Sequence, residues 1–380
     1  MSGSMSVQGS RGLMARRSFL PYFDMVSERG IIPSLLVKIL VKEGHEVRVF
    51  TAVFVTVMCL LGVASPGAAQ CEPDGAIEFI CGPVSPEDLI QIPGSPWVIV
   101  SSMEDDGYLS VTDSRDYAST VMFPLATSLP RHDTAAYGSC PGMAMEGFRP
   151  HGINLRPGRD NVHTLYVVRH GARESVEVFA VDAGRPTPTF TWVGCAVAPD
   201  GLGLNAVVPL PDDGFAATSP RTSDVWEWHT DTGWIKVPGS EDIGPNGLEI
   251  SADGRWFYIA RYAGQSVVRL SRGQTPIRKE TIEIGFNVDN IHWALDGSLL
   301  AAGHSTPTRT RVGECMRERR CEGITSRVAR VDPELLTARE IFTYATNDYL
   351  LLGTVAIQVG NEIWVGGIAG GERIVRIPTP

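Results

Sequence analysis

From residue 75 to residue 380 the apolar residues fall into short runs that are rich in β-branched and aromatic side chains. Turn signals separate these runs, among them PDDG (211–214), SADG (251–254) and ALDG (294–297). Short apolar runs bounded by Gly, Pro and Asp predict β-strands. The clearest predicted strands are WVIVSS (97–102), TLYVVRH (164–170), SVEVFAV (175–181), RWFYIAR (255–261), QSVVRL (265–270), SLLAAGH (298–304) and EIWVGGI (362–368).

Diverged internal repeats connect these strands. The segment PNGLEISADGRWFYIARYAGQSVVRL (245–270) gives a small polar cluster, an apolar step, a DG turn and then strands. Segments 149–170, 204–219 and 288–304 repeat this order. Residues 70–380 number 311 (380 − 69), or six units of about 52 residues, near the roughly 40–50 typical of propeller blades. The sequence therefore predicts an all-β fold, a six-bladed β-propeller, rather than a single sandwich.

Composition excludes two classes of protein. Apolar residues make up 43% of the chain, which is enough to build a core and argues against disorder. The formal net charge is −10, and it is unevenly distributed. Residues 1–69 hold seven Lys and Arg against four Asp and Glu, which leaves 26 against 39, or −13, for the rest. No basic stripe is available for phosphate groups, so nucleic acid is not an expected partner.

The N-terminal part is typical of an export signal. The uncharged run VFTAVFVTVMCLLGV (49–63) follows Lys42 and Arg48, and ASPGAAQ comes next. A basic flank, an apolar core and small residues indicate a signal peptide cleaved near Ala69. We therefore divide the chain into an N-terminal extension with a signal peptide (1–69) and a six-bladed propeller domain (70–380). The protein is expected to be secreted or periplasmic. An uncleaved signal that anchors it to the membrane is the alternative.

Cysteine usage agrees with export. Six cysteines lie beyond the apolar run, and an even number in an exported chain favours disulfides, for which about 15 pairings exist. Close spacing makes local bridges 71/81 and 315/321 plausible, and leaves 140/195 to join two longer segments. Free buried thiols are the alternative. The basic run RTRVGECMRERRCEG (309–323) is interpreted as a solvated loop pinned by a short bridge.

Oxygen-bearing side chains recur where the predicted blades begin. They are Asn205, Asn246, the adjacent Asp289 and Asn290, and Glu87 ahead of the first strand. In a propeller these positions converge on the central channel. Calcium accepts six to eight oxygen ligands, including amide oxygens, whereas magnesium requires a tighter octahedron. The pattern predicts a calcium site in the central channel. For any one of these residues, ordinary turn formation is the alternative.

Three histidines accompany the same openings. His151 follows Pro150, His170 ends a predicted strand, and His304 ends another. Imidazole titrates near neutral pH, so a pair beside a metal ion could activate water. The alternative is that each ring caps a strand through hydrogen bonds to the backbone. We find no nucleophile elbow, Walker loop, HExxH motif or dinucleotide fingerprint.

Five segments in the same order resemble the paraoxonase/arylesterase family. They are FRPHGI, LYVVRH followed by SVEVF, PNGLEISADGRWFYIAR, VDNI with a later GH, and LGTVAIQVGNEIWVGGI. This family consists of calcium-dependent lactonases with a six-bladed propeller, within the wider gluconolactonase-like superfamily. The likeness runs from about residue 85 to the C-terminus, with interruptions around 220–240 and 306–345.

The resemblance implies a role for each matching position. The implied ligands of a catalytic calcium are Glu87, Asn205, Asn246, Asp289 and Asn290. His151 and His170 match the family's histidine dyad, and His304 matches a histidine that lines the active-site wall. Asp88 and the carbonyl of Ile153 match the ligands of a second, structural calcium. Two features depart from the family. Ala206 stands where an Asp is expected, which puts the structural ion in doubt. No cysteine follows Cys321, so the family's bridge to the final strand is absent.

These expectations combine into calcium-assisted hydrolysis of a lactone or aryl ester. The ion would polarise the carbonyl, and His151, oriented by His170, would deprotonate water. Asp289 acting as a nucleophile is an alternative route. A sugar-lactone hydrolase and a non-catalytic, calcium-braced binding module are alternative functions. The expected partner is a small lactone or ester, with membrane contact only through an uncleaved signal.

Overall fold

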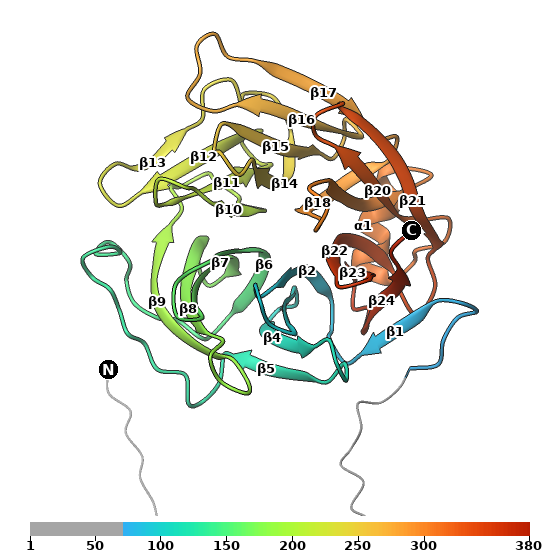
Figure 1. The fold of residues 1–380 in the computed structure, drawn as a ribbon, viewed down its shortest axis with the longest axis horizontal. Helices are drawn as coiled ribbons and strands as arrows, with labels where there is room; N and C mark the ends of the chain where they lie inside the picture. Colours follow the sequence, from blue (N-terminus) through green and yellow to red (C-terminus); the bar gives the residue numbers. More distant parts are fainter. Residues whose placement is uncertain (1–70) are drawn as a thin grey trace, which may run out of the picture. The chain divides into compact units, whose positions relative to one another are not determined.

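The computed structural model describes residues 71–380, which form six four-stranded antiparallel sheets around a central channel (Figure 1). The predicted all-β six-bladed propeller is confirmed. The expected signal peptide and membrane anchor lie outside the described residues. Within residues 71–380, no helix is long and apolar enough to cross a membrane.

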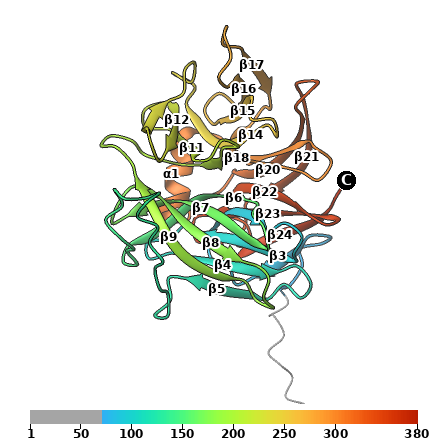
Figure 2. The same cartoon turned by 60° about the vertical axis from the view of Figure 1, so that its left-hand side comes forward.

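Each of the first three blades is a run of four consecutive strands, with the first strand innermost (Figure 1). Figure 2 shows the second of these blades from the side. Their bounds are β2 (Pro86–Gln91), β3 (Trp97–Ser102), β4 (Tyr108–Asp113) and β5 (Ser119–Phe123); β6 (Phe148–Arg156), β7 (Val162–Gly171), β8 (Ser175–Asp182) and β9 (Thr189–Val197); β10 (Val207–Pro209), β11 (Phe215–Ser219), β12 (Asp224–His229) and β13 (Gly233–Lys236).

The remaining three blades follow the same plan. Their bounds are β14 (Pro245–Ile250), β15 (Trp256–Arg261), β16 (Ser266–Ser271) and β17 (Lys279–Glu283); β18 (Asn287–Trp293), β19 (Leu299–Ser305), β20 (Thr325–Asp332) and β21 (Thr337–Ala345); β22 (Leu352–Val359), β23 (Glu362–Ile368) and β24 (Arg373–Pro378). The last blade is completed by the first strand of the fold, β1 (Glu78–Cys81), which pairs with β24 and closes the ring.

The apolar cores lie between neighbouring blades. Strand β3 shows why its sequence is a continuous apolar run. Trp97 and Ile99 pack against the second blade, while Val98 and Val100 pack against the last one. Successive side chains of a strand point to opposite faces, and in a propeller both faces are covered by a neighbouring blade. Six such inter-blade clusters, with a seventh beneath the helix, pack the ring together.

The innermost strands are irregular at the positions that face the channel. Register shifts interrupt β2, β6, β14, β18 and β22. A β-bulge leaves residues unpaired in the ladder and re-aims their side chains. Gly152 and Gly247 lie in two of these bulges, where an added Cβ would stand 2.5 Å and 2.6 Å from backbone oxygens of the next blade. Glycine is therefore needed for the inner strands to approach this closely.

Three disulfides join Cys71 to Cys81, Cys140 to Cys195 and Cys315 to Cys321. This pairing is the one that the spacing made plausible, and it indicates an oxidising compartment outside the cytoplasm.

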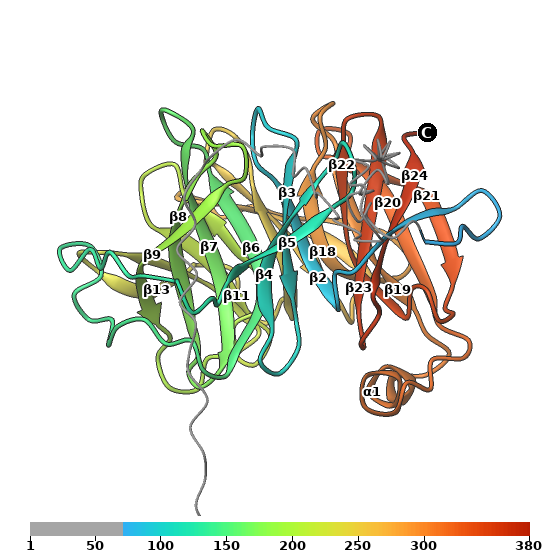
Figure 3. The ribbon, with the colours of Figure 1, turned by 90° about the horizontal axis from the view of Figure 1, so that it is seen from below.

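The interpretation of 309–323 as a loop is wrong for its first part. Residues Arg309–Glu318 form helix α1, which extends beyond the strands on one face of the ring (Figure 3). Arg, Glu and Met favour helix. Val312 and Cys315 on α1 pack against Leu351, so the helix has an apolar anchor on the propeller.

Candidate metal centre and histidine pair

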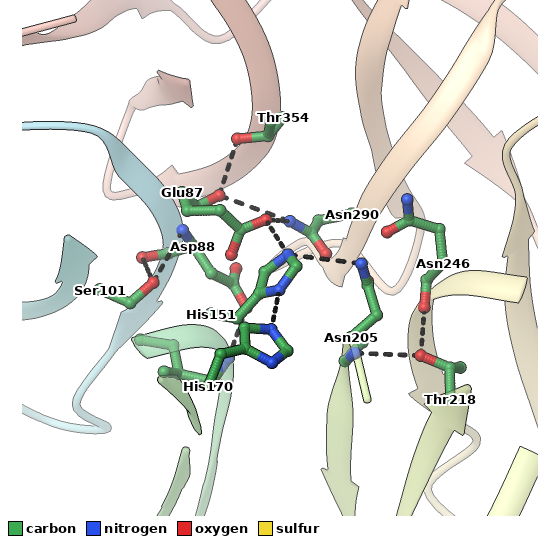
Figure 4. Close-up of polar contacts among 12 residues, drawn as sticks. Glu87, Asp88, Ser101, His151, His170, Asn205, Thr218, Asn246, Asn290 and Thr354 are labelled. Carbon is green, nitrogen blue, oxygen red and sulfur yellow. Dashed lines mark hydrogen bonds and ion pairs between the residues drawn. The ribbon is translucent and has the colours of Figure 1, made fainter. Parts of the chain in front are cut away.

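The candidate ligands come from four different strands or strand openings but meet in one channel. Glu87 occupies the bulge of β2, Asn246 that of β14, and Asp289 and Asn290 that of β18. Asn205 directly precedes β10. Figure 4 shows Glu87, Asn205, Asn246 and Asn290 around a common centre. The bulges bring these side chains together, because a regular strand would turn alternate residues into the inter-blade cores.

Glu87 is held from three directions and is only 1% exposed. The amide of Asn290 donates a 2.7 Å hydrogen bond to Glu87 Oε1, and the hydroxyl of Thr354 donates one of 2.8 Å to the Glu87 backbone carbonyl. His151 Nε2 lies 3.5 Å from Glu87 Oε1. The second carboxylate oxygen, Oε2, is buried and has no hydrogen-bond partner.

Three buried oxygens of this set lack a hydrogen-bond partner: Glu87 Oε2, Asn205 Oδ1 and Asn246 Oδ1. Buried polar atoms without a partner are rare, and each normally has a functional reason. Carboxylate and carboxamide oxygens gathered in this way fit calcium, which binds neutral amide oxygens readily. Within residues 71–380, no three His, Cys, Asp or Glu side chains form a metal-binding group. The candidate set instead holds two carboxylates and three carboxamides.

The electrostatics of the channel also favour a cation. Asp289 is 7% exposed, and burial together with the negative charge of Glu87 raises the pKa of Asp289 to about 8, although His151 and the amide of Asn246 oppose the shift. Two buried carboxylates repel each other, so ionising both of them carries a high free-energy cost. A divalent cation between them would remove this repulsion.

His151 and His170 form a hydrogen-bonded pair that continues to Glu174. His151 Nδ1 lies 2.8 Å from His170 Nε2, and His170 Nδ1 lies 2.8 Å from Glu174 Oε2. Asn205 Nδ2 faces His151 Nε2 at 3.3 Å. A carboxylate only accepts and an amide N–H only donates. The contacts at the two ends of this row of hydrogen bonds therefore place the ring proton on Nδ1 of both histidines and leave a lone pair on His151 Nε2.

This lone pair faces the candidate ligands. Burial opposes protonation of His151, but the charges of Glu87 and Asp289 outweigh it and raise the pKa of His151 above its ordinary value. His151 is thus a stronger base than a free imidazole, and the proton that it accepts is stabilised by neighbouring carboxylates.

Both ring nitrogens of His304 already form hydrogen bonds within the protein. Its Nδ1 donates to the carbonyl of Gly353 at 3.1 Å, and its Nε2 accepts from the hydroxyl of Tyr262. Burial lowers the pKa of His304 to about 4, so the ring is neutral at pH 7. Both ring nitrogens are committed to protein partners, which suits a wall residue rather than a base.

The positions matched to a structural calcium have different surroundings. Asp88 contacts the N–H of Ile153, at 2.7 Å, and Nε2 of His292, at 2.6 Å. His292 Nδ1 lies 3.1 Å from Glu249 Oε1. Burial opposes a charge on His292, but Asp88 and Glu249 outweigh it and raise the pKa of His292 to about 10. We call Asp88, Glu249 and His292 the Asp88 cluster.

Sequence reasoning missed several residues of these networks. Glu174 lies four residues after His170, across the tight β7–β8 hairpin, and this spacing could have indicated the contact. His292 and Glu249 lie two and three residues after candidate ligands, on the same inner strands. No sequence pattern indicates the roles of the Thr218 and Thr354 hydroxyls, because these roles depend on which blades become neighbours in the fold.

Comparison with known proteins agrees with this architecture. The chain is 26% identical to human serum paraoxonase/lactonase 3 over 251 residues, which covers 60% of this chain and 68% of that protein. No protein-family profile matches the chain.

Among solved structures, a gluconolactonase from Xanthomonas campestris superposes with a TM-score of 0.50 at 12% identity, covering 83% of this chain and 99% of that one. A protein of unknown function from Bacteroides thetaiotaomicron also gives 0.50, at 11% identity, covering 82% and 74%. These structural likenesses show the fold alone. The chain is thus a distant homologue of serum paraoxonase/lactonase 3, built on the six-bladed propeller that it shares with a gluconolactonase.

Proposed function

We propose that this protein is a calcium-dependent hydrolase of lactones and aryl esters. The observation that carries the proposal is the set of three unpartnered, buried oxygens on Glu87, Asn205 and Asn246, beside a histidine pair whose lone pair faces them. Glu87, Asn205, Asn246, Asp289 and Asn290 would hold the ion. When bound, calcium would polarise the substrate carbonyl and stabilise the negative charge that develops on its oxygen.

The protein's own residues would move the proton. His151 Nε2 would remove a proton from water as the water oxygen bonds to the carbonyl carbon. His170 would hold the Nδ1–H of His151 in place, and Glu174 would do the same for His170 and stabilise the positive charge on the pair. When the ester C–O bond breaks, His151 would return the proton to the departing alkoxide. The net reaction adds one water across the ester bond.

Asp289 as a nucleophile remains the alternative route. Its raised pKa, about 8, favours the protonated acid and makes it a poor nucleophile without the ion. The two routes differ in products under single turnover. Attack by Asp289 would release the alkoxide and leave a mixed anhydride, and water that opens this anhydride at the Asp289 carboxyl carbon would leave one Asp289 oxygen in the product. Direct attack by water would take all of the new oxygen from solvent labelled with ¹⁸O.

The test is turnover of alkyl lactones, sugar lactones and aryl esters by the purified protein, first with calcium and then with chelator. We expect turnover that chelator abolishes and added calcium restores. Asn246→Ala and Asp289→Ala should each lose most activity, while Asn361→Ala, at an exposed turn of the last blade, should keep it. Full turnover by Asp289→Ala in chelator would refute the proposal.

Two other results would assign a different function. A clear preference for sugar lactones over alkyl lactones and aryl esters would indicate a sugar-lactone hydrolase with the same ion. A melting temperature that depends on calcium, with no turnover of any ester, would indicate a calcium-braced binding module.

A further inference from the structure

We propose that the imidazole of His292 stands where a second metal ion would otherwise lie, so that this chain holds one calcium ion rather than two. The inference rests on the proposed function only in taking the channel ligands around Glu87 as the single calcium site. It concerns the Asp88 cluster, which lies on three inner strands, β2, β14 and β18.

The carboxylate of Asp88 is already satisfied by protein groups. His292 Nε2 and the N–H of Leu89 contact Oδ1, at 2.6 Å and 2.9 Å. The N–H of Ile153 donates to Oδ2 at 2.7 Å. These contacts use three of the roughly four lone-pair sites of the carboxylate, which leaves little of it for an ion. The contact between Ile153 and Asp88 uses the N–H of Ile153, not the carbonyl that the resemblance implies as a ligand.

The ring of His292 lies between two carboxylates and contacts both of them. Its Nδ1 is 3.1 Å from Glu249 Oε1, and this oxygen also accepts a 3.3 Å hydrogen bond from the amide of Asn154. Both ring nitrogens therefore face carboxylate oxygens, and these contacts use oxygens that an ion would need. Asp88, Glu249 and His292 are 3%, 5% and 4% exposed, where an isolated charge would be costly and a paired one is required.

Ala206 removes what an ion would need. It stands where the resemblance expects a carboxylate, is 4% exposed, and packs in an apolar cluster with Val208 and Leu248. With no carboxylate at Ala206, and with Asp88 and Glu249 both in contact with the ring of His292, the site offers few free oxygens to calcium.

The two halves of the channel differ in the state of their oxygens. Around Glu87, three buried oxygens lack a partner, whereas no side-chain atom of Asp88, Glu249 or His292 is among the buried unpartnered atoms of residues 71–380. An ion is needed where oxygens are left over and is not needed where hydrogen bonds already use them. His292 would thus link β2, β14 and β18 without metal, while Ile153 and Asn154 join β6 to the same carboxylates.

The experiment counts calcium in the full-length protein after unbound ion has been removed. We expect one calcium per chain in the native protein, one in the control Asn361→Ala, and none in the double variant Asn246→Ala/Asp289→Ala. Two ions in the native protein, or one ion retained by the double variant, would overturn the inference. No ion in the native protein would contradict the proposed function but still support a metal-free Asp88.

A second measurement does not depend on any variant. Crystals of the native protein grown with terbium, a calcium mimic with strong anomalous scattering, should show one anomalous peak, in contact with Glu87 and Asn246. A peak in contact with Asp88 would overturn the inference, even if the channel peak were also present.

Discussion

The hydroxyl of Thr218 donates a 2.6 Å hydrogen bond to the backbone carbonyl of Asn246, which belongs to the next blade. The same hydroxyl accepts a 3.0 Å hydrogen bond from the N–H of Ala206, the residue that directly follows Asn205. One side chain therefore fixes the backbone at two candidate ligands (Figure 4). Groups that orient metal ligands in this way contribute to affinity although they never touch the ion.

Thr218→Val should weaken calcium binding by roughly 10- to 100-fold, because valine keeps the shape of threonine but leaves both backbone groups unpaired. Thr218→Ser keeps the hydroxyl and should bind calcium nearly as well as the native protein. Calorimetric titration of each variant measures the effect. Equal affinities for Val and Ser at this position would show that the hydroxyl does not set the ligand geometry.

Glu174→Gln should lower kcat by roughly 10- to 100-fold, since the amide can present an N–H to His170 and reverse the hydrogen-bond direction through the pair. The glutamine oxygen can still accept the 2.5 Å bond from the N–H of Leu204, next to Asn205. Calcium affinity should therefore change little. Steady-state kinetics and calcium titration separate the two effects, with Glu334→Gln at an exposed turn as control. An unchanged kcat would remove Glu174 from the proton path.

Calcium should bind more tightly as pH rises. Asp289, with a pKa of about 8 in the ion-free protein, must lose its proton to bind a cation, so below pH 8 the ion competes with that proton. The affinity should fall by up to about tenfold for each pH unit below 8. Titrations from about pH 6 to about pH 9, in buffers of different ionisation enthalpy, count the protons released.

Asp289→Asn carries no such proton, so its affinity should be lower and should depend less on pH. The exposed control Asp231→Asn should behave as the native protein does. A native affinity that stays constant between pH 6 and pH 8 would contradict the expectation.

The disulfide Cys140–Cys195 should contribute more to stability than Cys315–Cys321. The first spans 55 residues and the second only 6. By loop entropy, the bridges contribute about 4 and about 2 kcal/mol to the free energy of unfolding. Double Cys→Ala variants of each pair, unfolded in denaturant with calcium present, measure the difference. A larger loss for the 315/321 variant would mean that the anchoring of α1 outweighs the chain-entropy effect.

Much of the blade pattern could be predicted from the sequence, because local signals define a hairpin. The run WVIVSS matches β3 residue for residue, and SADG and ALDG form the turns that lead into β15 and β19. Helix α1 was missed. Its pattern is short and strongly basic, and it is held by apolar contacts with Leu351 from a distant part of the chain.

The candidate ligands could be found because each belongs to a repeated opening, and the repeat itself predicts convergence. The Asp88 cluster could not be found in this way. His292 looks like one more residue of a strand until the fold brings Asp88 and Glu249 to either side of its ring. Contacts between residues about 200 positions apart, such as Asp88 with His292, depend on ring closure, which no local pattern encodes.

Closure by β1 and β24 also sets an order on folding. Glu78 pairs with Arg376, and Cys81 with Arg373, so the first strand of the ring has no partner until the last one has been made. Bringing chain ends so far apart in sequence together carries the highest loop-closure cost in the molecule. During synthesis the earlier blades can assemble as hairpins, while the channel stays open on one side. The complete ligand set joins Glu87 of the first blade to Asp289 and Asn290 of the fifth, so it requires the ring to close.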